Sequence, residues 1–184
     1  MSRIQLLPIG KADLSSLGLL GAALTAEIGI PCEVMAGGLD PEPSLHPERR
    51  QYCSIDILSR MQEQLAPNPG RLLGVTPLDL YIPILTFVFG EAQLDGSCAV
   101  VSTHRLRQEF YGLPPDQELL QGRLVKESIH ELGHTFGLTH SDNYCCAMAA
   151  SHTVELIDLK SSSLCTDCRA RSRAALSRSS MEAS

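Results

Sequence analysis

The segment HELGHTFGLTH, residues 130–140, constrains this chain more than any other stretch. His130 and His134 are four residues apart, so on a helix their imidazoles lie one above the other on the same face. Gly137 follows three residues later, where a glycine allows a left-handed turn that ends a helix. The chain can then double back and bring His140 to the same ion. The spacing therefore predicts a long helix that ends in a three-histidine metal site.

Three neutral imidazoles leave the fourth tetrahedral position of a zinc ion open for water, which is typical of catalytic rather than structural sites. Glu131, next to His130, can reach the outer shell of the ion without being a ligand. Zinc lowers the pKa of its water, and Glu131 would take the proton as hydroxide attacks a peptide carbonyl that the zinc polarises. Glu131 would later pass a proton to the leaving amine. The pattern predicts a zinc-dependent peptidase with Glu131 as general base.

Early strands and helices in alternation, followed by a long helix, predict a mixed α/β sheet covered by helices. We expect strands or extended segments at residues 3–9, 31–35, 72–75, 79–82, 86–90 and 97–102, and helices at 14–28, 54–65 and 117–136. Asp13 would cap the first helix. The residues expected to face inward are Leu14, Leu17, Gly21, Leu24 and Ile28, then Ile55, Leu58 and Leu65, then Leu120, Leu124 and Leu132. Residues 1–184 are read as one compact domain, with a flexible tail over 171–184.

Charge and cysteine content narrow the class of protein. The formal net charge is -6, which gives no reason to expect nucleic-acid binding. The N-terminus does not resemble a signal peptide, and the apolar stretch at 14–30 is too short to span a bilayer. We therefore expect a cytoplasmic monomer without membrane contact. There are seven cysteines, and four of them lie in the last third of the chain, which in a cytosolic protein favours metal ligation over disulfides.

The extended histidine motif resembles that of the metzincin metalloproteases, which carry a methionine in a tight turn beneath the zinc. Met148, eight residues after the last histidine, is the candidate. The short spacing from Cys146 to Met148, followed by Cys165 and Cys168, resembles the archaemetzincins more closely. Segments 78–83, 87–92 and 100–102 also resemble this family, so the resemblance covers most of the chain.

The archaemetzincin resemblance implies a metzincin-like fold with a mixed, twisted sheet, a long active-site helix and a Met-turn. It also implies two zinc ions, one catalytic and one structural. The structural zinc would be held by four cysteines and would clamp the C-terminal segment to the turn at Met148. Peptide or protein substrates would lie along an edge strand near residues 87–91. The vertebrate members of the family are described as aminopeptidases, and the small size of this chain favours exopeptidase activity or cleavage of short peptides over digestion of folded proteins.

One position departs from the family pattern. The family has a cysteine directly after the third histidine, where this chain has Ser141, and serine is a poor structural zinc ligand. Three cysteines match the pattern: Cys146, Cys165 and Cys168. The adjacent Cys145 is our preferred fourth ligand. Asp142 or His152 could serve instead, or the second site is weakened or lost.

A competing hypothesis is a zinc-stabilised, non-catalytic binding or regulatory protein with an occluded first site. Access of solvent to the metal beside Glu131 distinguishes it from a peptidase. A zinc-ribbon nucleic-acid binder would depend only on Cys165, Cys168 and the nearby arginines, and the acidic chain argues against it.

Overall fold

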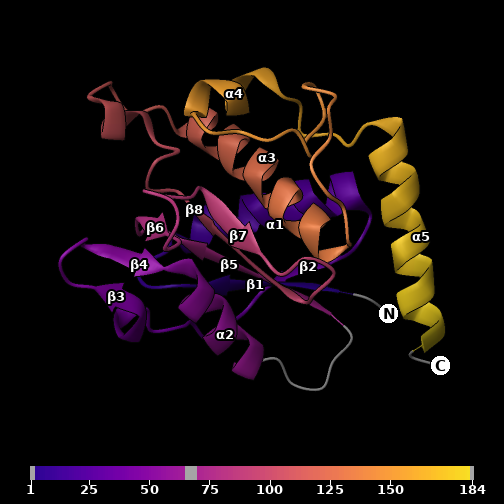
Figure 1. Cartoon of the computed structure of the whole chain (residues 1–184), viewed down its shortest axis with the longest axis horizontal. Coiled ribbons are helices and arrows are strands. Elements are labelled where there is room, and N and C mark those ends of the chain that lie inside the picture. Colours follow the sequence, from indigo (N-terminus) through magenta and orange to yellow (C-terminus); the bar gives the residue numbers. More distant parts are fainter. Residues whose placement is uncertain (1–2, 65–69, 183–184) are drawn as a thin grey trace.

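The structure is a computed structural model that describes residues 3–64 and 70–182 (Figure 1). Within these residues, a five-stranded sheet has the strand order β2-β1-β5-β8-β7. The strands are β1 (Ile4–Pro8), β2 (Cys32–Val34), β5 (Arg71–Thr76), β7 (Gly90–Ala92) and β8 (Cys98–Ser102). Neighbouring strands are parallel except β7, which pairs antiparallel with β8 and forms one edge. A small second sheet joins β3 (Leu45–His46), β4 (Gln51–Cys53) and β6 (Leu80–Tyr81).

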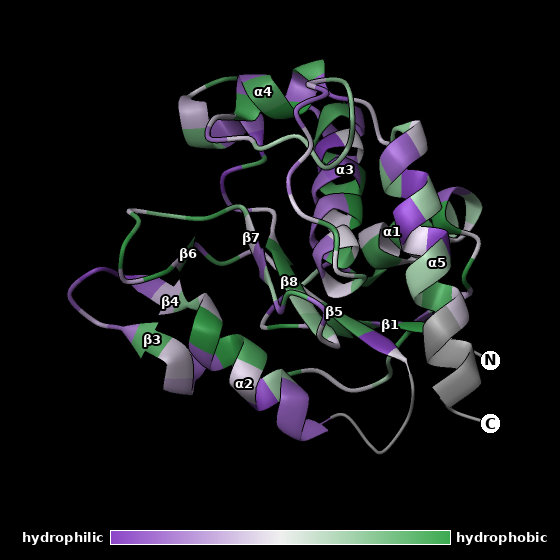
Figure 2. Cartoon of the chain, turned by 45° about the vertical axis from the view of Figure 1, so that its right-hand side comes forward, coloured by the Kyte–Doolittle hydropathy of each residue, from purple (hydrophilic) through white to green (hydrophobic). Residues whose placement is uncertain are grey.

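Helices cover both faces of the larger sheet. Helices α1 (Leu14–Ile28) and α3 (Gln117–Thr135) lie on one face, and α2 (Ser54–Gln64) lies on the other (Figure 1). Alternation along β1 explains this arrangement, because Leu6 packs into the core under α1 and α3 whereas Leu7 packs into the core under α2. The strands between the helices are accordingly rich in hydrophobic residues (Figure 2). The expected mixed α/β fold is confirmed.

Most of the expected elements are present, with differences in which side chains face inward. Asp13 caps α1, accepting hydrogen bonds from the amides of Ser15 (3.1 Å) and Ser16 (3.3 Å). Leu14 is wrong as a core residue, because it lies in the first turn with 62% of its surface exposed. Ile55 is likewise 50% exposed. The buried face of α2 is formed by Ser54, Ile57, Leu58 and Met61. The expected inward residue Leu65 lies outside the described residues.

The strand expected at residues 86–90 begins later, at Gly90. The carbonyl oxygens of Leu85 and Thr86 accept hydrogen bonds from the Arg49 side chain, and Thr86 also accepts one from Gln51. These carbonyls are therefore satisfied by side chains instead of by a strand ladder. Val88 makes only an isolated bridge to Leu80.

The C-terminal segment is helical. Helix α5 (Thr166–Glu182) continues through the residues where we expected a flexible tail, as far as Glu182. Ser172 and Ala175 are buried on one side of it, and Arg169 forms an ion pair with Glu27 of α1 at 3.2 Å. Short helix α4 (Val154–Leu159) and the 3-10 turns Glu42–Ser44 and Gln108–Tyr111 complete the described elements. None of the described helices has the length and apolar character needed to cross a membrane.

Candidate active site

Helix α3 carries the histidine motif and ends where the sequence predicts. Asp116 caps its start by accepting a hydrogen bond from the Leu119 amide at 2.9 Å. At the other end, Gly137 has φ +78° and its amide donates to the carbonyl of His134 at 2.9 Å. Only glycine adopts this left-handed backbone readily, so Gly137 closes the helix and turns the chain back. The turn brings His140 beside the two helical histidines.

The three histidines converge on one point. One ring nitrogen of each of His130, His134 and His140 lies within 4.8 Å of the other two. Nδ1 of His130 is 2.9 Å from the carbonyl oxygen of Ala147, and Nδ1 of His134 is 2.8 Å from that of Leu138. A carbonyl only accepts hydrogen bonds, so both Nδ1 atoms carry protons and both Nε2 atoms present lone pairs.

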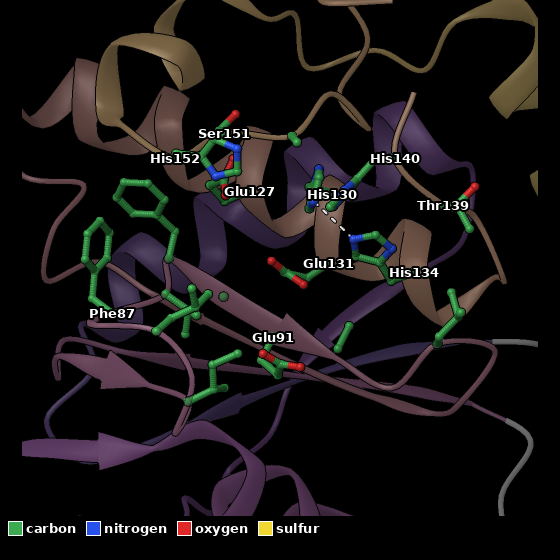
Figure 3. A pocket seen from close by; sticks show the side chains of 18 of the residues that line it. Phe87, Glu91, Glu127, His130, Glu131, His134, Thr139, His140, Ser151 and His152 are labelled. Atoms are coloured by element: carbon green, nitrogen blue, oxygen red, sulfur yellow. Dashed lines mark hydrogen bonds between the residues drawn. The ribbon is translucent and has the colours of Figure 1, made fainter. Parts of the chain in front are cut away.

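These two Nε2 atoms are 3.1 Å apart (Figure 3). Burial, with a further contribution from Lys160, lowers the pKa of His130 to about 3, so this imidazole is neutral near pH 7. Two lone pairs at this distance repel each other unless a cation lies between them. On a tetrahedral zinc ion with Zn–N bonds of about 2.0–2.1 Å, two nitrogens are about 3.3 Å apart. The donor set therefore fits zinc, with the backbone carbonyls fixing the ring orientations.

Glu131 points into the same site from the buried side of the helix (Figure 3). Its side chain has no hydrogen-bond partner within residues 3–64 and 70–182, and the residue is 5% exposed. Burial raises the pKa of Glu131 well above its ordinary value, and the carboxylates of Glu127 and Glu91 raise it further. A nearby dication would favour the ionised form. Glu131 thus lies beside the three histidines and is not among the residues whose ligand atoms converge on one point.

The histidines and Glu131 line one cleft of about 650 Å³. One wall is formed by edge strand β7, with Glu91, and by the segment that leads into it, with Phe87 (Figure 3). The opposite side includes Ser151 and His152. No lysine or arginine lines the cleft among the described residues. The metal position is therefore accessible from an open, partly apolar cleft, as a peptidase requires.

Met148 lies beneath the histidine site in a buried turn. It is 0% exposed, its carbonyl accepts from the Ser141 amide at 3.0 Å, and the preceding residue Ala147 holds His130. A methyl group at Gly133 of α3 would collide with the Met148 sulfur. The turn and the helix therefore touch closely, as expected for a Met-turn.

A second cluster lies nearby, at the start of α5. The sulfur atoms of Cys146, Cys165 and Cys168 all lie within 4.8 Å of one another. The backbone amide of Cys168 lowers the pKa of the Cys165 thiol by hydrogen bonding. Burial raises the pKa of the Cys168 thiol. Three converging thiols fit a soft metal such as zinc.

The prediction that Cys145 is the fourth ligand of this cluster is wrong. Cys145 is exposed and lies outside the cluster, because adjacent side chains in this turn project in different directions. Asp142 and His152 also lie outside it. Ser141 lies closer to the cluster, with its Oγ 3.8 Å from the Sγ of Cys165.

Four residues that the sequence reading did not single out also shape the site. Gly90 and Gly133 leave space for Glu131 and Met148, respectively. Glu127 lies in the cleft wall, and its Oε1 is 2.7 Å from Nζ of Lys160, which is also buried. The spacing of four between Glu127 and Glu131 was a visible signal, since both lie on one helix face. Nothing in the sequence pointed to Lys160.

Comparison with known families agrees with this geometry. The model of "Peptidase family M54" matches residues 55–173, which include both candidate metal sites. The chain belongs to peptidase family M54. It is 39% identical over 166 residues to archaemetzincin from Methanocaldococcus jannaschii, covering 90% of each chain. It is 37% identical over 188 residues to archaemetzincin from Pyrococcus abyssi, covering 97% of this chain and 98% of the relative.

Solved structures of this family have the same fold. A zinc-dependent peptidase from Methanocorpusculum labreanum superposes with a TM-score of 0.85 at 31% identity, covering 92% of this chain and 99% of that one. Archaemetzincin from Methanopyrus kandleri gives a TM-score of 0.81 at 33% identity, covering 96% and 97%. The archaemetzincin resemblance is confirmed, and the chain is a zinc metallopeptidase of this M54 group.

Proposed function

We propose that this M54 peptidase binds its catalytic zinc through His130, His134 and His140 and uses Glu131 as the general base. The main support is the pair of Nε2 lone pairs 3.1 Å apart, held by backbone carbonyls, beside a buried carboxylate without a partner among the described residues. Such a set needs a cation to be stable, and it leaves a position open for water. The competing non-catalytic hypothesis required an occluded site, whereas these residues line a cleft.

The chemistry of the residues follows from their positions. When bound, zinc lowers the pKa of water and polarises the scissile carbonyl. Glu131 accepts the proton from the attacking water, because no hydrogen bond from the described residues ties up its carboxylate. The burial that raises the pKa of Glu131 also makes its carboxyl group a competent proton donor, so it delivers the proton to the leaving amine. The close packing of Met148 against Gly133 keeps the turn that contains Met148 in contact with helix α3.

The edge strand β7 supports a mode of substrate binding. Its residues Gly90–Ala92 pair with β8 on one side and line the cleft, so the other edge is available to an extended peptide. A peptide that added a strand there would pass directly over Glu131. We propose peptides or unfolded protein segments as substrates. Aminopeptidase-like trimming and internal cleavage both fit this geometry.

We propose a second, structural zinc at Cys146, Cys165 and Cys168. It would link the turn before Met148 to the first turn of α5, and so fix the C-terminal helix against the active site. We further propose a cytoplasmic monomer that binds neither nucleic acid nor membranes. The net charge of -6 and seven free cysteines support this.

The test is digestion of a mixed peptide library by the zinc-loaded protein, read by mass spectrometry, with Glu131→Ala and Glu131→Gln run in parallel. We expect cleavage that disappears in both variants while the zinc content stays unchanged. The product ends distinguish trimming from internal cleavage. Absence of cleavage by zinc-loaded native protein would contradict the proposal and favour the binding-protein hypothesis.

A further inference from the structure

The second cluster holds three thiols that are already arranged for a metal ion. Sγ of Cys146 accepts hydrogen bonds from the amides of Cys165 (3.2 Å) and Met148 (3.4 Å). Amide hydrogen bonds to sulfur stabilise the thiolate, which is the form that binds metal. Cys146 and Cys168 are buried, and Cys165 is half-buried. Three ligand directions are thus fixed by the backbone of two segments.

Ser141 lies next to the cluster, on the side of Cys165. Its Oγ is 3.8 Å from Cys165 Sγ and accepts a hydrogen bond from the Asn143 amide at 3.2 Å. Its own amide donates to the Met148 carbonyl at 3.0 Å, so the backbone of Ser141 is held by the turn that contains Met148. A neutral hydroxyl is a poor ligand for zinc compared with a thiolate. Ser141 therefore lies close to the cluster, but its hydroxyl would bind zinc weakly.

Cys145 does not compensate for this weakness. It is exposed, and its amide donates to the Asn143 side chain at 3.0 Å while its carbonyl accepts from Ser161 at 3.0 Å. Both backbone groups of Cys145 are thus tied to neighbouring residues. The backbone of Cys145 is therefore fixed in a conformation that leaves its side chain exposed and outside the cluster.

The Ser141 side of the cluster opens to solvent. A surface hollow of about 420 Å³ is lined by residues 140–143, by 165–168 and by Arg171. An incoming ligand can therefore reach the fourth position without any movement of the chain. Arg171 lines this hollow together with Asp142 and Asp167, so the charge around the hollow does not by itself select an anionic ligand.

We propose that the second metal site binds zinc through three thiolates and keeps an exchangeable fourth position beside Ser141, which takes water or a small thiolate from solution. This rests on the second zinc proposed above. In the exchange, the incoming thiol gives its proton to solvent as its sulfur bonds to the metal, and the water leaves. Zinc with three thiolates carries one net negative charge, and a fourth thiolate gives the charge of a four-cysteine zinc site.

Cobalt substitution tests this without reference to catalysis. Absorption from sulfur-to-cobalt charge transfer arises only at the cysteine site, because the other site has no sulfur ligand. Ser141→Cys is expected to raise this absorption by about one third, since four thiolates replace three. It should also tighten metal binding by more than the roughly 10- to 100-fold that an outer-shell partner contributes. Because a thiol can also bind the open position of the histidine site, the thiol is added in a His134→Ala/His140→Ala background, which removes two ligands of that site. There mercaptoethanol should raise the absorption to the level of the protein that also carries Ser141→Cys, at unchanged metal content, and leave the latter protein unaffected.

The control is Cys145→Ser, which should leave the native spectrum unchanged. A loss of absorption in Cys145→Ser would overturn the proposal, because Cys145 would then be the fourth ligand. Equal absorption in native protein and Ser141→Cys would also overturn it, as would loss of cobalt on addition of the thiol. The same spectra recorded in the Glu131→Ala background separate the two proposals. If the peptidase proposal fails, the cobalt spectrum still tests the cysteine site. If the cysteine site gives no thiolate absorption, the peptide digestion still tests the peptidase proposal.

Discussion

Gly90 of the edge strand and Glu131 of the active-site helix lie so close that no side chain fits between them. A methyl group at Gly90 would lie 2.6 Å from Oε1 of Glu131 and 2.6 Å from its Cγ. The glycine therefore allows the strand that would bind substrate to approach Glu131, the proposed general base, directly. The close approach also explains why Glu131 is buried although it faces a cleft.

Gly90→Ala is expected to displace the Glu131 carboxylate and reduce kcat by about 10- to 100-fold, because misplacement of a catalytic group by roughly 1 Å has such an effect. Zinc content should be unchanged, since Glu131 is not a ligand. Steady-state kinetics on a cleaved peptide, with zinc analysis, provide the measurement. Gly18→Ala in α1, where an added methyl group meets nothing within 4 Å, is the control and should keep native activity. Native kcat in Gly90→Ala would contradict this assignment.

Two glycines of helix α3 should respond in opposite directions to alanine. Gly133→Ala forces a methyl group against the Met148 sulfur and is expected to lower the free energy of unfolding by roughly 1–3 kcal/mol. Gly122 is exposed and has nothing within 4 Å, so Gly122→Ala should raise stability by about 0.5–1 kcal/mol through helix propensity. Urea unfolding of both variants measures the difference. A neutral Gly133→Ala would show that the methionine turn is not packed as described.

The buried ion pair between Lys160 and Glu127 should be sensitive to loss of one partner. Nζ of Lys160 lies 2.7 Å from Glu127 Oε1 and also donates to the Ala149 carbonyl at 3.3 Å. Burial raises the pKa of Glu127, and Lys160 opposes that rise. Lys160→Met leaves an unpaired buried carboxylate in the cleft wall and should cost roughly 3–5 kcal/mol of stability.

A double-mutant cycle separates the ion pair from simple packing. Adding Glu127→Leu to Lys160→Met removes the unpaired charge, so the double variant should recover part of the lost stability. Thermal or urea unfolding of both single variants and the double variant gives the coupling energy. If the two losses simply add, the pair does not interact as its 2.7 Å separation indicates.

Asp13 should account for a pH-dependent part of the stability of α1. Hydrogen bonds from Ser15, first from its hydroxyl and then from its amide, lower the pKa of the Asp13 carboxyl, and the amide of Ser16 adds to this. A carboxyl whose pKa is lower in the folded state stabilises the fold above its unfolded pKa, and this stabilisation is lost as the pH falls through the folded pKa. Asp13→Ala should cost about 1 kcal/mol at neutral pH.

The measurement for Asp13 is unfolding of native protein and Asp13→Ala at several pH values. Their difference in stability should shrink in acid, where the native carboxyl also becomes neutral. A difference that stays constant down to acidic pH would mean that the cap acts through its shape rather than its charge.

The sequence alone determined the local features of the first metal site. The spacing of His130, His134 and Gly137 acts within one helix and its terminal turn, where 3.6 residues per turn and the left-handed glycine fix the geometry. The Asp13 cap and the boundaries of α1 were predictable for the same reason. The family pattern of cysteines could be read because it too depends on spacing in the chain.

Only the tertiary structure decided which distant residues meet. Lys160 reaches Glu127, and Gly90 reaches Glu131, across 33 and 41 positions of the chain. No helical or strand period connects such residues, so local patterns give no signal. The same holds for Cys145 and Ser141. Both stand near the cysteine motif in sequence, but the fold brings the serine beside Cys165 and leaves Cys145 exposed to solvent.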